Sequence, residues 1–150
     1  MKKLLILIWV SSCFFSFSQS DTLNRTDKFG KKYGYWKKYN NQKKLEYEGM
    51  FYNGEPIGEF TYYHPNGKPK NISFFAANTP IVTTTMFHEN GSILAEGNYY
   101  NKEKDGKWVY YNLSKKIVME ENYNKGKKQG ISRVYDQNGK ILLEECNWSN

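Results

Sequence analysis

The chain repeats itself with a period of 24 residues, and this period restricts its fold more than any other feature. The copies begin at Gly34, Gly58, Val82, Gly106 and Gly130, without insertion or deletion between them. Five residues after each start stands an aromatic residue: Tyr39, Tyr63, Phe87, Tyr111 and Tyr135. Repetition at one fixed period is typical of proteins that stack a small structural unit many times. We therefore expect a repeat array.

Three other columns of the repeat keep the same register. Two residues after the start, three copies carry a large ring: Trp36, Phe60 and Trp108. Eleven residues after the start stand Leu45, Pro69, Ile93, Ile117 and Ile141. Fourteen residues after it stand Glu48, Ile72, Glu96, Glu120 and Glu144. Because several columns agree at one period, chance similarity does not explain the pattern.

Each copy contains two extended runs, as in residues 107–111 and 116–123. Both runs are rich in β-branched and aromatic residues and are bounded by turn-forming residues, which is the pattern of strands. No copy shows the spacing of an amphipathic helix. The sequence therefore predicts an all-β fold, an elongated antiparallel meander of about five repeated β-hairpins in a single sheet, with about ten strands.

The turn inside each copy has explicit chemistry in three copies, where Asn-Gly ends the loop. Gly67, Gly91 and Gly139 provide the positive φ that closes such a turn. We predict a short hairpin loop that ends in a glycine bulge. Segments 40–43 and 112–115 lack this glycine, so we expect looser turns there. Longer connections are expected between hairpins, at residues 53–57, 101–105 and 124–129.

The tight turn also predicts which residues face each other across a hairpin. When the two strands pair on either side of this turn, Tyr111 lies opposite Ile117, and Tyr135 lies opposite Ile141. Such cross-strand pairs contribute about 0.2–1 kcal/mol each. The same register places Glu120 across from Trp108. A slip of one residue would exchange the two faces of a strand.

The third copy departs most from the pattern. Val82 replaces the opening glycine, Thr84 replaces the ring, and Thr79-Pro80 precedes the copy. We expect it to mark either a bend in the array or a contact surface. The last copy carries Ser132 and Asn147 where other copies have aromatic residues, which fits a polar cap on the array.

Residues 1–18 have the features of a secretory signal peptide. Two lysines precede an apolar run, and Ser16 and Ser18 provide small residues before a cleavage site. We expect an irregular leader at 19–29 and repeats at 30–150. The protein is then exported, to the periplasm, the cell envelope or the medium.

Two alternatives concern the same N-terminal segment. A membrane anchor is disfavoured, because the apolar stretch of ~14 residues is shorter than the ~20 that span a bilayer. A lipoprotein attached through Cys13 is the other alternative. Cleavage after Ser18 would leave Cys146 as the remaining cysteine, so no internal disulfide could form. We expect Cys146 to be a small packed residue, because its column holds Met50 and Phe74.

The columns together resemble a known family. Gly-x-Trp-x-x-Tyr, followed by Asn-Gly-Lys and then by a Glu and an aromatic residue, is similar to the MORN repeat in its bacterial variant form, over about residues 30–148. The resemblance implies β-hairpin rods that contact proteins or membrane lipids and do not catalyse reactions. Chains of this kind are also labelled YwqK-family antitoxins of toxin–antitoxin systems. The residues that carry the repeat are Gly34, Trp36, Tyr39, Gly58, Phe60, Tyr63, Gly67, Phe87, Gly91, Gly106, Trp108, Tyr111, Gly130, Tyr135 and Gly139.

Candidate catalytic and metal-binding residues have a simpler structural interpretation. His64 and His88 share one column, but two histidines without a third ligand make a weak zinc site, and both open turns. The glutamate column suggests paired carboxylates, yet its repetition indicates a structural ladder with Lys and Tyr neighbours. We therefore expect no enzyme activity, no metal and no cofactor.

Lysine pairs form the remaining candidate surface. They are Lys37-Lys38, Lys115-Lys116 and Lys127-Lys128. The formal net charge is +7, and falls to +5 if Lys2 and Lys3 are removed with the signal peptide. A solvated face is the main interpretation; an anionic membrane or glycan surface is the second, and export argues against nucleic acid.

The sequence therefore predicts a non-enzymatic, exported binding or scaffold module that contacts a protein partner of unknown identity. Association with an anionic membrane or glycan surface through the lysines is an alternative. The antitoxin role that the resemblance implies is another alternative, although a signal peptide fits poorly with a cytoplasmic toxin.

Overall fold

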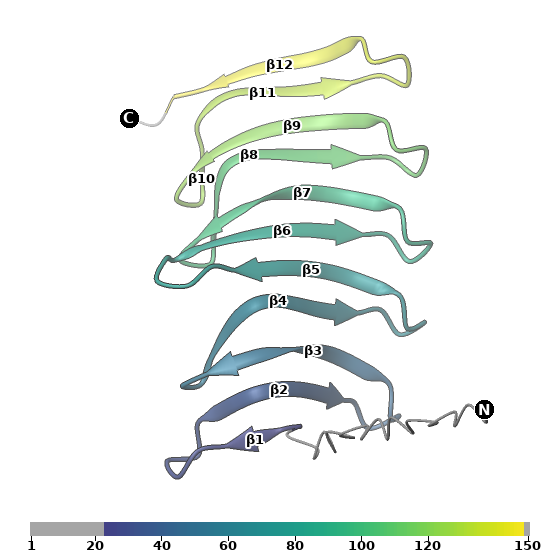
Figure 1. Cartoon of the computed structure of the whole chain (residues 1–150). Coiled ribbons are helices and arrows are strands. Elements are labelled where there is room, and N and C mark those ends of the chain that lie inside the picture. The colour runs from purple at the N-terminus through teal and green to yellow at the C-terminus, as the bar shows by residue number, and fades with distance from the viewer. Residues whose placement is uncertain (1–22, 149–150) are drawn as a thin grey trace, which may run out of the picture.

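The computed structural model describes residues 23–148, and in this range the chain forms one antiparallel sheet of twelve strands (Figure 1). The strands are β1 (Arg25–Thr26), β2 (Lys32–Tyr39), β3 (Leu45–Tyr52), β4 (Glu55–Tyr63), β5 (Pro69–Phe75), β6 (Ile81–Phe87), β7 (Ile93–Tyr100), β8 (Glu103–Tyr111), β9 (Ile117–Asn124), β10 (Lys127–Lys128), β11 (Gly130–Tyr135) and β12 (Ile141–Asn147). They lie side by side in chain order, except that β10 pairs with β9 next to β11. The predicted all-β meander of hairpins is confirmed.

The sheet begins before the first complete copy. Strand β1 lies within the segment that we expected to be an irregular leader, and it pairs with β2 through Arg25 opposite Tyr33. The predicted signal peptide, residues 1–18 with Cys13, lies outside the described residues.

The five tight turns inside the copies all lie on the same side of the sheet, where the strands end (Figure 1), and they have the same backbone hydrogen bonds. The first residue of each turn exchanges hydrogen bonds with residues three and four positions later, at 2.8–3.1 Å. The expectation of looser turns at 40–43 and 112–115 is wrong. Lys43 and Lys115 adopt φ values of 60° and 61° in place of glycine, while the Asn112 Oδ1 accepts two backbone N–H groups, from Ser114 and Lys116.

The loops at the opposite ends of the strands are also shorter than the sequence indicated. Hairpins are joined there by two-residue loops in which both residues have positive φ, the type I′ geometry that suits the twist of paired strands: Asn53-Gly54, Asn101-Lys102 and Lys125-Gly126. The prediction of longer connections is therefore wrong at these three places. Residues that we assigned to the connections belong to the strands that follow.

The glycine that opens a copy lies at an irregularity of the strand ladder. Between β3 and β4, Gly49 pairs with Phe60 but the next residue, Met50, pairs with Ile57, which leaves Gly58 and Glu59 as extra residues. Gly58 has a φ of 67°, which glycine adopts without a Cβ clash. Gly34, Gly106 and Gly130 also have positive φ.

The third copy lacks this irregularity because valine replaces the glycine. A β-branched residue is a strong outlier at positive φ, and the β5–β6 ladder runs without a shift from Asn71 opposite Met86 to Phe75 opposite Val82. The chain reverses instead through residues 76–80. The degenerate copy therefore changes the local register and lengthens one loop.

The predicted cross-strand pairs are partly confirmed. Tyr111 lies opposite Ile117, and Tyr135 lies opposite Ile141. The predicted pair of Glu120 with Trp108 is wrong, because Glu120 faces Val109 and Trp108 faces Glu121. A register shift between Tyr110 and Tyr111 places one extra residue in β9, and an extra residue exchanges the faces beyond it.

The core of this single-layer sheet consists of large rings that cover glycines of the preceding strand. Phe60 and Trp108 are 1% and 0% exposed. A Cβ added to Gly49 would lie 2.2 Å from the Phe60 Cδ2, and one added to Gly97 would lie 2.4 Å from the Trp108 Cδ2. The Trp108 Nε1 donates a hydrogen bond of 3.0 Å to the Asn98 carbonyl. Glycine therefore makes the space in which each ring is buried.

We predict that Gly97→Ala lowers the free energy of unfolding by about 1–3 kcal/mol, because a methyl group forces the Trp108 ring out of its place. Denaturant unfolding followed by tryptophan fluorescence measures the loss. Thr83→Ala, at an exposed strand position, is the control and should stay within about 0.5 kcal/mol of the natural chain. Equal stability of both variants would contradict the role of Gly97.

We also predict that Lys115→Gly raises the free energy of unfolding by about 0.5–1 kcal/mol. Relief of the left-handed conformation, which costs a residue with a Cβ roughly 1–2 kcal/mol, exceeds the added entropy of the unfolded chain. Ser114→Gly in the same turn is the matched control, and it should lose stability because Ser114 does not have a positive φ. A loss in both variants would show that the lysine is not strained.

Candidate binding groove

The two faces of the sheet carry different chemistry. One, the aromatic face, carries the column of Trp36, Phe60, Thr84, Trp108 and Ser132. The other, the ladder face, carries the column of Glu48, Ile72, Glu96, Glu120 and Glu144. The paired positions separate them, since Trp108 lies opposite Glu121 while its neighbour Val109 lies opposite Glu120 and successive side chains of a strand point to opposite faces.

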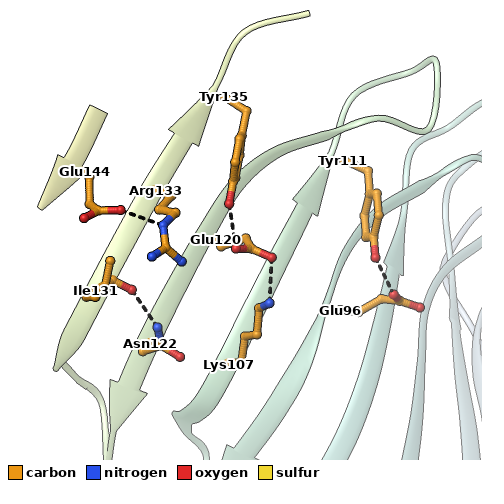
Figure 2. A network of polar contacts seen from close by, with 9 residues as sticks. All are labelled: Glu96, Lys107, Tyr111, Glu120, Asn122, Ile131, Arg133, Tyr135 and Glu144. Atoms are coloured by element: carbon orange, nitrogen blue, oxygen red, sulfur yellow. Dashed lines mark hydrogen bonds and ion pairs between the residues drawn. The ribbon is translucent and has the colours of Figure 1, made fainter. Parts of the chain in front are cut away.

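On the ladder face, Glu48, Glu96 and Glu120 each accept a hydrogen bond from the tyrosine of the next copy. Glu144, in the last copy, accepts one from the Arg133 Nε at 2.7 Å instead. Figure 2 shows the Tyr111 hydroxyl donating to Glu96 at 2.9 Å and the Tyr135 hydroxyl donating to Glu120 at 2.8 Å. Lys107 forms an ion pair of 2.6 Å with Glu120. The glutamates therefore tie neighbouring hairpins together, as the ladder interpretation predicted.

The sequence itself records this contact between copies. The tyrosine follows its glutamate by fifteen residues, as in Glu48 and Tyr63, which also form this bond. In the second copy Ile72 replaces the glutamate, and Phe87 replaces the tyrosine fifteen residues later. An apolar pair thus replaces a polar pair, so that neither hydroxyl nor carboxylate is left without its partner.

The Glu48–Tyr63 pair has shifted pKa values on both sides. Burial, and then the hydrogen bond to Glu48, raises the pKa of Tyr63 to about 12. The hydrogen bond from Tyr63, assisted by Lys37 at 3.0 Å, lowers the pKa of Glu48. These shifts follow from structural contacts between copies.

The aromatic face contains two ring clusters separated by a gap. The first cluster surrounds Phe60, with Phe51 and Phe75 edge-on to it at centroid distances of 5.1 and 5.7 Å. The second surrounds Trp108, with Tyr99 at 5.0 Å. Between them the third copy contributes Thr84 in place of a ring.

Small polar residues form the floor of this gap. Ser73 stands where a glycine lies under each ring, and it is paired with Thr84. The hydroxyls of Ser73 and Thr84 lie 3.0 Å apart, and the Asn71 Oδ1 accepts from them at 3.0 and 2.5 Å. Ser73 and Thr84 are 5% and 1% exposed, so the buried hydroxyls are satisfied locally.

The gap opens into a groove with aromatic walls. Its central part, of about 280 Å³, is lined by Tyr62, Asn71, Ser73, Phe75, Val82, Tyr99 and Lys102. A part of about 690 Å³ continues over Pro56, Ile57 and loop 76–80, and a part of about 560 Å³ continues past Tyr47 to Lys38 and Glu46. Tyr62 lines all three parts. We call these three neighbouring depressions together the third-copy groove.

The six lysines that we proposed as a partner surface do not gather in one place. Three form ion pairs within the chain: Lys37 with Glu48, Lys38 with Glu46 and Lys128 with Glu121. The Lys116 Nζ donates to the Gln137 carbonyl at 2.8 Å, Lys115 occupies its turn and Lys127 is exposed in β10. Lys38 alone among them lines the groove.

Other expected sites are also placed. Cys146 is exposed on β12, so the expectation of a packed residue is wrong; β12 is paired on one side, by β11 alone.

The His64 Nε2 lies 2.9 Å from the Phe87 carbonyl, which fits its turn role. Among residues 23–148, no three His, Cys, Asp or Glu side chains are grouped to hold a metal ion. Within that range no helix has the length and apolar character to cross a membrane.

Comparison with known families agrees with this geometry. The profile of the MORN repeat variant matches residues 56–77, 82–101 and 128–150. The chain therefore carries MORN repeat variant repeats across residues 56–150, a kind of module that typically mediates binding. No curated protein matches the chain in sequence.

Sequence reasoning identified the third copy but missed the residues that make the groove. Gly49 and Gly97 precede Phe60 and Trp108 by eleven residues, whereas Ser73 precedes Thr84 by the same spacing. This covariation was the available signal. A comparison of columns within single copies does not show this covariation, because each ring packs on the glycine of the neighbouring copy.

We predict that Tyr63→Phe changes how stability depends on pH. The Tyr63 contribution is complete below its unfolded pKa of about 10 and is lost as pH rises through about 12. The Glu48 contribution is complete above about 4.3 and is lost as pH falls through its lowered pKa. The natural chain should therefore exceed the variant by about 1–2 kcal/mol between these limits.

Denaturant unfolding from pH 3 to pH 12 measures this difference, with Tyr52→Phe at an exposed position as the control. The difference should shrink at both ends of the range for Tyr63→Phe only. A difference that does not change with pH would contradict the coupling of the two groups.

Proposed function

We propose that this chain is a non-enzymatic, exported binding module that holds a protein partner in the third-copy groove. The observation that carries the proposal is the interruption of the ring column at Thr84, which leaves a gap between two clusters of aromatic rings, with small polar residues beneath it. A ring at this position would fill the groove, as Phe60 and Trp108 fill the equivalent places on either side. The copy that departs from the repeat therefore makes room for a ligand between two clusters of rings.

The lining of the groove supports a protein partner. Tyr62, which is 37% exposed, Phe75 and Tyr99 provide wide apolar surfaces, and aromatic residues are enriched where protein interfaces derive most of their binding energy. Asn71 and Lys102 also line the groove, and both side chains carry N–H donors that can bond the carbonyl groups of a peptide. The groove runs over several strands of a rigid sheet, so little conformational entropy is lost when it binds.

Export is proposed from the N-terminal sequence. A positive start, an apolar run and small residues before Gln19 support a signal peptide. The partner is then expected in the cell envelope or outside the cell. Detection of a mature chain beginning at Gln19 in the envelope fraction would support this part of the proposal.

We predict that filling the groove abolishes partner capture. The variant Ser73→Gly with Thr84→Trp recreates the ring-on-glycine arrangement of Gly97 and Trp108, and so occupies the groove without leaving a cavity. The control is Thr83→Trp, the same substitution one residue away, which points to the other face. The natural chain and the two variants are immobilised and exposed to one envelope extract, and the retained proteins are compared by mass spectrometry.

A specific partner should be retained by the natural chain and by Thr83→Trp, and lost with the groove-filled variant. Unfolding midpoints of the variants establish that both are folded. Retention by the groove-filled chain would overturn the proposed site. Binding that is unaffected by the groove but disappears at high salt would favour the lysine-mediated anionic surface instead.

A further inference from the structure

Two copies hold a lysine of their own inside a cage of aromatic rings. In the first copy, the Lys32 Nζ lies 4.6 Å from the Trp36 ring, 4.7 Å from Phe51 and 5.4 Å from Tyr47. It also donates a hydrogen bond of 2.7 Å to the Tyr47 hydroxyl. The negative faces of the rings attract the ammonium group, and the hydroxyl accepts one of its protons.

The fourth copy repeats the arrangement with Lys104, two residues before its opening glycine. The Lys104 Nζ lies 4.6 Å from Trp108, 5.0 Å from Tyr123 and 5.2 Å from Tyr110. It donates to the Tyr110 hydroxyl at 2.6 Å. Burial lowers the pKa of Lys104, which indicates that this ammonium group is partly removed from water. A lysine ammonium group held by aromatic rings and a tyrosine hydroxyl thus occurs in two copies.

The second copy has the rings of such a cage but not the lysine. Phe60, Tyr62 and Phe75 occupy the columns of Trp108, Tyr110 and Tyr123, while Pro56 occupies the column of Lys104. The Phe60 ring lies 5.8 Å from Tyr62 and 5.7 Å from Phe75. Within residues 23–148, no lysine ammonium group lies over the Phe60, Tyr62 or Phe75 ring.

Phe60 itself is 1% exposed, so the rings of this cage that an incoming group can reach are Tyr62 and Phe75. These two rings and Pro56 line the third-copy groove. We propose that the cage binds the side-chain ammonium group of a lysine supplied by the protein partner. The inference rests on the proposed function and specifies what the partner inserts. The occupant is argued from the chain itself, since the equivalent cages of the first and fourth copies each contain a lysine ammonium group.

The hydrogen bond in the filled cages favours an ammonium group that carries an N–H over a quaternary one. Tyr62 stands in the column of Tyr110, so its hydroxyl is the acceptor for an N–H of the incoming lysine. Burial raises the pKa of Tyr62, and the hydroxyl therefore stays neutral at ordinary pH. Glu55 and Lys102 also line this part of the groove; the carboxylate favours a cation there and the ammonium group opposes it.

The test uses butylammonium, which is the side chain of lysine without its backbone, titrated into the natural chain and observed by the NMR signals of the aromatic rings. Butylammonium should cause saturable shifts of Tyr62 and Phe75. Pro56→Lys restores the internal lysine of the other cages and should weaken this binding by about tenfold or more. Pro56→Ala, which leaves the cage open, is the matched control and should keep the affinity.

Two further measurements separate the cage from nonspecific attraction. Tyr62→Phe should weaken butylammonium binding about threefold to tenfold and leave tetramethylammonium binding unchanged, because a quaternary ion has no N–H to donate. Lys102→Ala should strengthen the binding of both ions, because it removes a like charge. Equal butylammonium affinity in Pro56→Lys and Pro56→Ala, or the absence of saturable shifts in the natural chain, would overturn the inference.

The same variants distinguish this inference from the proposed function. If a partner is captured through the groove but Pro56→Lys retains it as well as Pro56→Ala does, the groove binds a protein and the lysine-cage inference fails. If butylammonium binds in the cage but the groove-filled variant still captures the partner, the cage exists and the proposed protein-binding groove fails.

Discussion

The packing of a large ring onto a glycine of the neighbouring hairpin is the interaction on which the rest of this structure depends. A single sheet has no second layer to cover its apolar side chains, yet Trp108 and Phe60 are almost completely buried. Burial is possible because Gly97 and Gly49 have no Cβ, so each ring lies close to the backbone and is surrounded by rings of adjacent strands. The same arrangement aligns one copy on the next, since the ring and its glycine belong to different hairpins. Stability therefore accumulates at the contacts between copies.

The other face completes this connection by hydrogen bonding. Glu48, Glu96 and Glu120 each accept a hydrogen bond from a tyrosine of the following copy. The single apolar substitution in the glutamate column, Ile72, is matched by Phe87 in the tyrosine column. Both faces therefore enforce the same register between hairpins, one by shape and one by partnered polar groups. Agreement between the two leaves little freedom for strand slippage, which is the usual difficulty of repetitive sheets.

Departure from the repeat creates the candidate site. Where Ser73 and Thr84 replace glycine and ring, the aromatic face opens into a groove, and the valine at the start of that copy removes the bulge that its neighbours have. The rings on both sides stay in place because their own glycines are intact. Pro56, at the edge of the groove, occupies the position from which Lys32 and Lys104 enter the ring cages of other copies. The regular copies thus hold the sheet in register, and one irregular copy opens the groove in which we propose that a partner binds.

The sequence by itself determined the period, the all-β class, the hairpin meander and the pairs about the tight turns, because strand alternation and turn chemistry act over a few residues. It did not determine that Lys43 and Lys115 adopt the glycine conformation, that the connecting loops have two residues, or that Glu120 lies opposite Val109. Those features follow from bulges and from contacts between copies, and a shift of one residue reverses the face of every side chain beyond it. The groove and the lysine cages were decided only by the tertiary structure, since each is built from residues of several strands whose columns meet across the hairpin boundaries.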